Sequence, residues 1–307
     1  IGGWSIDYLL KSCTFSFTEA SGVNTMFTDL VTSTWAPLLA HTGFLLVTTL
    51  IVVVGIKDGI EKFSKVMMPL LFFMVVAIAI YSMTLPGASA GLDYLFNPDF
   101  SKITGKAIAA ALGQAFFSLS VGMGCMVTYA SYFKKDSNLT STSMSVSLLT
   151  LLVATLAGLV IFPAVFSAGL EPAEGASLIL ITLPEIFKDM PFAGAWSSVF
   201  FLLLTLASLT STISFHEVLT AYFAEEYNLS RKTATYISSA LASALCMLSL
   251  FWVFDFDFAG IHLENSSCFD LFDYVTANIL MPLGGLFTCI FVAWWMKPDF
   301  LRGEITN

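Results

Sequence analysis

Residues 113 to 124 combine glycine, serine and glutamine in the middle of a membrane-length apolar stretch, reading Gly-Gln-Ala-Phe-Phe-Ser-Leu-Ser-Val-Gly-Met-Gly. Glycine costs about 1 kcal/mol per site in a helix interior, and backbone groups freed by a break need partners inside a bilayer. The segment therefore predicts a broken helix at about 118–124. Its free carbonyls would suit a small cation and its free amides a carboxylate. The alternative is that the glycines serve only close helix packing.

A second set of oxygen atoms lies on one face of a later helix. Ala207, Thr210 and Ser211 follow the i, i+3, i+4 spacing of helical neighbours. Two hydroxyls and a backbone carbonyl are hard ligands suited to a weakly held alkali cation. The alternative is that these hydroxyls bond back to carbonyls of their own helix, as is common in membrane helices.

Acidic groups near the ends of the helices have two interpretations. Asp270 and Asp273 lie one turn apart at the outer end of the last span, where a carboxylate is either functional or part of a solvated helix start. For His216 and Glu217 we favour an interfacial or paired group. Because the sequence contains no nucleophile–base pair, phosphate loop or metal-ligand spacing, we expect no enzyme activity.

The composition indicates a multi-pass membrane protein. Of the 307 residues 57% are hydrophobic and 11% are charged, against about 25% charged in soluble domains. The lipid bilayer is therefore the expected surroundings. The net charge of −9 argues against a nucleic-acid partner.

Apolar runs of about 20 residues mark the helices that cross the membrane. They predict an all-α polytopic fold with the tail of a span at 1–11 and complete spans at 36–54, 66–84, 107–132, 144–167, 195–219, 233–254 and 269–295. The apolar stretch 176–187 is too short to span, and we expect it to form a lid-like helix over the outer face.

The loops between these spans alternate in length and charge. Loops at 12–35, 85–106 and 168–194 are long, whereas those near 55–65, 133–143 and 228–232 are short. The short loops and the C-terminal tail hold nine of the Lys and Arg residues, and the other side holds four. The short loops are therefore expected to be cytoplasmic. Because the sequence starts with Ile1 inside an apolar run, we also expect a fragment of a longer protein.

Several motifs together resemble the neurotransmitter:sodium symporter family, especially its bacterial members of the leucine-transporter fold. The run from Gly113 to Tyr132 is similar to the family's sixth helix, and Gly59 to Phe63 with Lys65 and Pro69 is similar to its fourth-to-fifth connection. The eighth helix and the loop that follows it are matched by Leu209-Thr210-Ser211 and Leu229-Ser230-Arg231-Lys232, and the end of the third by Gly2-Gly3-Trp4.

The resemblance implies a partial inverted-repeat bundle, an architecture that is known for the family. Residues 1–106 would be the remnant of a first repeat, with the end of helix 3, helices 4 and 5 and outer loops. Residues 107–307 would form a complete second repeat, helices 6 to 10, with a cytoplasmic tail. Helices 1 and 2 would be missing.

The resemblance also implies two sodium sites. The carbonyl of Ala207 with Thr210 and Ser211 would hold one ion, and Ser118 would contribute to the other. Thr150 stands where the family usually has an asparagine ligand. Ala154 stands where some relatives have a glutamate that replaces chloride, so chloride dependence is left open.

For the substrate, the resemblance implies a pocket lined by both the broken segment and the eighth helix. The implied residues are Ser120, Met123, Ser211 and Phe215, with Phe117 as an aromatic lid and with Gln114 and Asp273 in an outer gate. Met123 and Phe215 would make the side-chain end of the pocket apolar and adaptable.

The implied function is sodium-coupled symport of a hydrophobic or aromatic amino acid by alternating access, in a bacterial inner membrane. Without helices 1 and 2 we expect the fragment to be inactive alone. The alternative is a non-transporting sensor or an ion channel of the same fold. Accumulation of substrate against its gradient separates a transporter from both.

Overall fold

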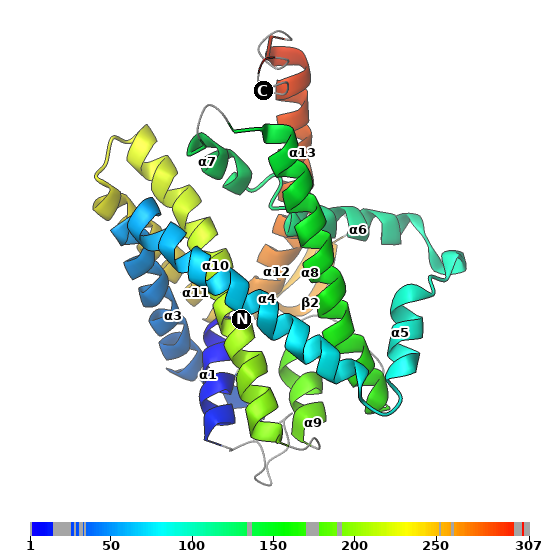
Figure 1. Cartoon of the computed structure of the whole chain (residues 1–307). Helices are drawn as coiled ribbons and strands as arrows, with labels where there is room; N and C mark the ends of the chain where they lie inside the picture. The colour runs from blue at the N-terminus through cyan, green and yellow to red at the C-terminus, as the bar shows by residue number, and fades with distance from the viewer. Residues whose placement is uncertain are drawn as a thin grey trace. The chain divides into compact units, whose positions relative to one another are not determined.

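The computed structural model describes residues 2–14, 26–27, 29–30, 33, 35–133, 137–169, 178–188, 192–251, 253–258, 261–297 and 303. The predicted helical class is confirmed, and one two-stranded hairpin accompanies the helices (Figure 1). The chain divides into two compact units. Unit 1 comprises residues 1–98 and 152–216, and unit 2 comprises residues 99–151 and 217–307.

Unit 1 contains α1 (Gly2–Cys13), α3 (Trp35–Val54), η2 (Ile56–Glu61), α4 (Lys62–Met83), α5 (Ala88–Phe96), η4 (Leu178–Thr182) and α9 (Leu183–Lys188). Unit 2 contains η3 (Phe100–Lys102), α6 (Gly105–Ser118), α7 (Cys125–Ser131), α11 (Arg231–Phe251), β1 (Val253–Phe258), β2 (Ile261–Ser267), α12 (Cys268–Val275), η5 (Thr276–Leu280), α13 (Met281–Ile290) and η6 (Phe291–Trp295). The helices α8 (Leu139–Ser167) and α10 (Ala193–Glu226) contribute to both units.

The predicted spans correspond closely to these helices. Five helical runs of the described chain are long and apolar enough to cross a membrane: 35–54, 59–83, 139–167, 193–226 and 271–295. The predicted span 107–132 is divided into α6 and α7, as its glycines indicated. The helix α11 lies where a span was expected at 233–254, but it is rich in serine and threonine and is not among these five runs.

Two expected loops and the end of one expected span differ from what the sequence indicated. The predicted loop 55–65 is almost entirely helical, because Gly59 and Ile60 both donate their amides to Gly55 O, at 3.0 and 3.1 Å, and η2 runs directly into α4. The predicted loop 85–106 contains α5. The predicted span 233–254 ends as a helix at Phe251, and residues 253–258 and 261–267 form the antiparallel pair β1–β2. Most of the loop at 12–35 lies outside the described residues.

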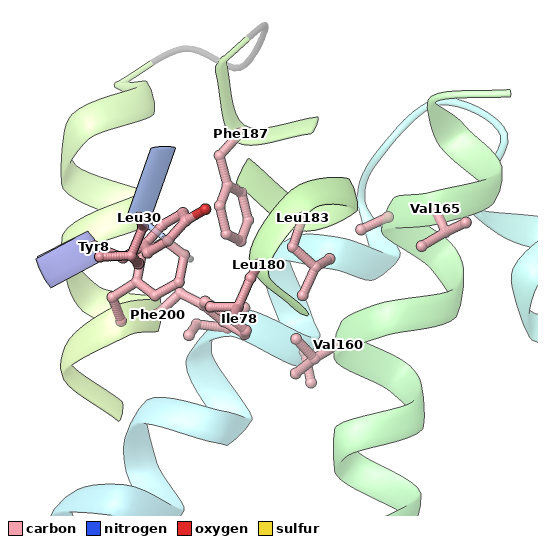
Figure 2. Close-up of a cluster of buried hydrophobic side chains, with 12 residues drawn as sticks. Tyr8, Leu30, Ile78, Val160, Val165, Leu180, Leu183, Phe187 and Phe200 are labelled. Carbon is pink, nitrogen blue, oxygen red and sulfur yellow. The ribbon is translucent and has the colours of Figure 1, made fainter. Parts of the chain in front are cut away.

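A cluster of large apolar side chains forms the core of unit 1 (Figure 2). Tyr8, Phe201, Leu180 and Leu183 have no exposed surface. The Tyr8 and Phe201 rings lie 5.0 Å apart between centroids, a favourable aromatic distance. The short apolar helix predicted at 176–187 corresponds to η4 and α9, and only its first two residues lie outside the described chain. The expected division into repeats at residue 106 stays a prediction, because compactness does not test repeat symmetry.

Candidate functional site

The helix break lies between Ser118, the last residue of α6, and Cys125, the first residue of α7. Ser120 donates its amide to Phe117 O at 3.0 Å, and Val121 donates its amide to Phe116 O at 2.9 Å. This pair of bonds is the Schellman pattern that ends a helix on a left-handed residue. The break expected from the glycine content is therefore present, at the predicted residues.

Three residues of the break have left-handed backbone angles. The φ values are +54° at Ser120, +82° at Gly122 and +79° at Gly124. Glycine adopts these angles freely, but a residue with a Cβ atom is strained there by about 1–2 kcal/mol. Ser120 therefore retains a strained conformation beside a helix end, a combination that is enriched at functional sites.

The side chains around the break are accessible within unit 2. Gln114 donates from Nε2 to the Ser118 hydroxyl over 3.3 Å, one turn apart on α6. Phe117 is half exposed, at 50%. The N-cap residue of α7 is Gly124, which has no side chain to cap the first turn of the helix.

The second set of candidate ligand oxygen atoms, from Ala207, Thr210 and Ser211, lies on α10 within unit 1. The Thr210 hydroxyl donates to Ala207 O at 2.8 Å. This is the back-bonding alternative, and it also holds the two proposed ligand oxygens next to each other. Ser211 is exposed, and Phe215 is 41% exposed.

The predicted site residues divide between the two units. Unit 1 holds Ala207, Thr210, Ser211 and Phe215, and unit 2 holds Gln114, Phe117, Ser118, Ser120, Met123, Thr150 and Asp273. Within the units, the structure brings together Gln114 with Ser118 and Ala207 with Thr210. Asp273 is exposed on α12. The assignment of these eleven residues to ion, substrate and gate stays a prediction.

A buried ionic cluster in unit 2 confirms that Glu217 is a paired group, although the sequence did not identify its partners. Glu217 on α10 is completely buried and accepts from both terminal nitrogens of Arg231, at 3.0 and 2.5 Å. The Tyr132 hydroxyl donates to the same carboxylate at 2.8 Å. The cluster thus joins the C-terminal end of α7, the end of α10 and the start of α11.

Charge pairing explains this arrangement. A carboxylate without exposed surface needs a paired cation and additional donors to offset its desolvation, and the bidentate arginine with the phenol supplies them. Burial lowers the pKa of the Arg231 guanidinium, but hydrogen bonds and charge from Glu217 more than compensate, so the net pKa is raised. A glutamate inside a membrane-length helix followed by an arginine after a short loop was the available signal.

The chain is similar to known proteins along nearly its whole length. The family model described as "Sodium:neurotransmitter symporter family" matches residues 6–307. The chain is 35% identical to the uncharacterized sodium-dependent transporter YhdH of Bacillus subtilis, over 100% of this chain and 68% of that protein. It is 32% identical to an uncharacterized sodium-dependent transporter of Haemophilus influenzae, with the same two coverages.

A solved structure also matches the whole fold. The crystal structure of MhsT in complex with L-phenylalanine has a TM-score of 0.88 and 36% sequence identity. The match covers 99% of this chain and 69% of that one. At this identity and coverage the similarity extends beyond the arrangement of helices to the sequence along almost the whole chain.

Proposed function

Because the chain belongs to the sodium:neurotransmitter symporter family, we propose that its protein moves a hydrophobic or aromatic amino acid together with sodium ions by alternating access. The family consists of sodium-dependent membrane transporters, so the chain is an integral multi-pass membrane protein and not an enzyme. The observation that carries the proposal is the break at residues 119–124, with its left-handed Ser120, Gly122 and Gly124. A helix that only spans the membrane would not contain such a break, because the freed backbone groups need hydrogen-bond partners inside the lipid.

One proposed sodium site uses oxygen atoms of unit 1, and the other uses oxygen atoms of unit 2. Ala207 O, Thr210 and Ser211 would hold one ion, which would replace the 2.8 Å hydrogen bond from the Thr210 hydroxyl to Ala207 O. Ser118 and Thr150 would contribute to the second ion. Hydroxyl and carbonyl oxygens are the ligands that hard cations prefer. Ala154 offers no carboxylate, so a chloride requirement is tested directly by replacing chloride with gluconate.

The proposed substrate pocket combines polar backbone with apolar side chains. As the family resemblance implies, the unwound segment around Ser120 would hold the amino and carboxylate groups, and Met123, Ser211, Phe215 and Phe117 would contact the substrate side chain. The exposure of Phe117 and Phe215, at 50% and 41%, supports a role in contacting a ligand. MhsT, which was crystallised with L-phenylalanine, supports an apolar side chain in the substrate. Gln114 and Asp273 would belong to an outer gate.

The buried ionic cluster fits a closed cytoplasmic end. Tyr132 follows the second half of the broken helix, and Glu217 pairs with Arg231 of the short basic loop 228–232, which we expect to be cytoplasmic. Movement of α7 away from α10 would break the Tyr132–Glu217 bond. We therefore propose that this cluster closes the inner end of the transport path and opens when substrate is released.

The working protein is proposed to contain helices beyond those of this chain. The chain covers 68% of its Bacillus relative and 69% of MhsT. A further broken helix would supply the remaining sodium and substrate ligands, and the chain by itself would be inactive. A bacterial inner membrane is the proposed location, in line with the bacterial relatives.

The test uses the full-length protein reconstituted in proteoliposomes with an inward sodium gradient. Phenylalanine or leucine should accumulate above its outside concentration, whereas aspartate and glycine should not. Accumulation of only small polar or acidic amino acids would overturn the substrate class. A sodium current without accumulation would indicate the channel alternative, and binding without either would indicate the sensor.

Thr210→Ala tests the sodium site itself. Loss of one ligand oxygen should raise the sodium concentration for half-maximal uptake about ten-fold, which corresponds to ~1.4 kcal/mol. Thr212→Ala is the matched control, because its hydroxyl bonds to Ser208 O at 2.8 Å on a different face of the same helix. Equal sodium dependence in both variants would count against the assigned ion site.

A further inference from the structure

The break in the helix rests directly on the backbone of α13, with glycine on both sides of the contact. A Cβ atom added to Gly284 would lie 2.6 Å from Gly122 O and 3.2 Å from Gly122 Cα. A Cβ atom added to Gly122 would lie 3.1 Å from Gly285 N and would overlap the Met281 carbonyl. The two backbones therefore approach each other with no side chain between them.

The contact continues along α6 on the same side. A Cβ atom at Gly285 would overlap the ring of Phe116, and one at Gly113 would lie 3.3 Å from Ala277 O. α6 and the break thus follow η5 and α13 from residue 113 to residue 122, within unit 2.

Adjacent glycines inside a helix are unfavourable, by about 1 kcal/mol each. Gly284 and Gly285 lie in the interior of α13, after Pro282 has begun it. A packing requirement explains them, because the atoms opposite Gly284 are backbone and cannot move aside as a side chain can. At Gly43 on α3, by contrast, an added Cβ atom would meet no atom within 4 Å.

The position of this contact connects it to the substrate. Gly122 lies between Ser120 and Met123, two of the residues that we assign to the pocket. The hydrogen bonds that end α6 extend only to the amide of Val121, so packing against a neighbouring surface contributes to the position of the residues that follow. For Gly122 that surface is the α13 backbone.

We propose that Gly284 and Gly285 are positioning residues of the substrate site. They let α13 approach the break closely enough to fix the placement of Ser120 and Met123, and so the space available to the substrate side chain. This inference rests on the proposed amino-acid transport, but the contact itself does not depend on the nature of the substrate.

The first experiment compares Gly284→Ala with Gly43→Ala in full-length protein reconstituted in proteoliposomes. Gly284→Ala should raise the KM for phenylalanine about five-fold or more, with sodium half-saturation changed less than two-fold. Gly43→Ala should leave both unchanged. An unaltered KM in folded Gly284→Ala protein, or an equal change in both variants, would overturn the proposal.

A rescue experiment separates positioning from general damage to the helix. Gly285→Ala collides with the Phe116 ring, so adding Phe116→Leu to it should restore most of the KM. The same Phe116→Leu change should not rescue Gly284→Ala, which collides with backbone. Rescue of both variants, or of neither, would contradict the contacts on which the proposal is based.

A third measurement does not require transport. Met123→Cys, in protein whose native cysteines are replaced, reports the position of the break through its rate of reaction with a soluble maleimide. Gly284→Ala should change this rate several-fold, and Gly43→Ala should not. If the parent protein accumulates no amino acid, the transport proposal fails, and this measurement still decides the positioning role. An unchanged rate would overturn it.

Discussion

The two compact units differ in how many large apolar side chains they bury, whereas both bury polar side chains, such as Ser5 and Thr48 in unit 1. Unit 1 has a continuous apolar core in which Tyr8, Phe201, Leu180 and Leu183 are completely enclosed. The described part of unit 2 buries few large apolar side chains, and its completely buried side chains include Glu217, Thr220, Thr235 and Ser238. Met281 is the large apolar side chain that is buried there, at 2% exposure.

This difference has mechanical consequences. Apolar packing is dense, and it resists partial displacement because dispersion contacts are lost with small gaps. Hydrogen bonds and ion pairs are discrete, so a polar cluster can exchange one set of partners for another. Unit 1 therefore has the properties of a scaffold. Unit 2 carries the broken helix, the buried ionic cluster and the glycine contact, and it has the properties of a region that rearranges.

The largest effect is expected in the core of unit 1. Phe201→Ala removes a ring with no exposed surface that packs against Tyr8 and Phe200 at centroid distances of 5.0 and 5.3 Å. We expect it to lower the free energy of unfolding by about 4 kcal/mol, measured by denaturation in detergent. Phe73→Ala is the control, because that ring is 70% exposed and should cost less than about 1 kcal/mol. Equal losses would contradict the scaffold interpretation.

The next largest effect concerns the ionic cluster of unit 2. Glu217→Ala leaves Arg231 without its carboxylate partner, and we expect a loss of about 3 kcal/mol. The double change Glu217→Leu with Arg231→Met removes both charges and should recover most of the stability. Thermal unfolding in detergent measures all three proteins.

A surface pair supplies the control for that prediction. Lys65 and Glu61 are 72% and 49% exposed, so Glu61→Ala should cost less than about 1 kcal/mol. If the double change at 217 and 231 were as destabilising as the single one, lost packing and not an unpaired charge would be the cause.

The smallest effect is expected from the phenol. Tyr132→Phe removes one hydrogen bond to a charged acceptor that keeps its arginine, and should cost about 1.5 kcal/mol. The same variant should change the balance between inward- and outward-facing states, measured by the accessibility of a cytoplasmic cysteine probe. An unchanged balance would assign the bond a structural role only.

The sequence was most informative where one local pattern decides the structure. The break at 118–124 was predictable because three glycines and a polar flank disfavour a continuous helix whatever surrounds them. The spans were predictable because lipid demands about 20 apolar residues in each. The helical segment at 56–61 was not predictable, since Gly55 and Gly59 locally favour a loop.

The pairing of Glu217 with Arg231 and Tyr132 was beyond local patterns. These residues are 14 and 85 positions apart in the chain, and many partners for a buried carboxylate are chemically possible. The glycines at 284 and 285 were equally ambiguous, because their partner Gly122 lies more than a hundred residues earlier.

By itself the sequence determined that this is a multi-pass membrane protein with a broken sixth helix. Both conclusions follow from residue types within single segments, because each residue of a span must be compatible with lipid whichever helices pack beside it. The sequence also carried the family resemblance, since the motifs are short and local. The tertiary structure decided which donors satisfy Glu217 and which backbone supports the break. Those outcomes depend on contacts between distant segments, and only folding brings the segments together.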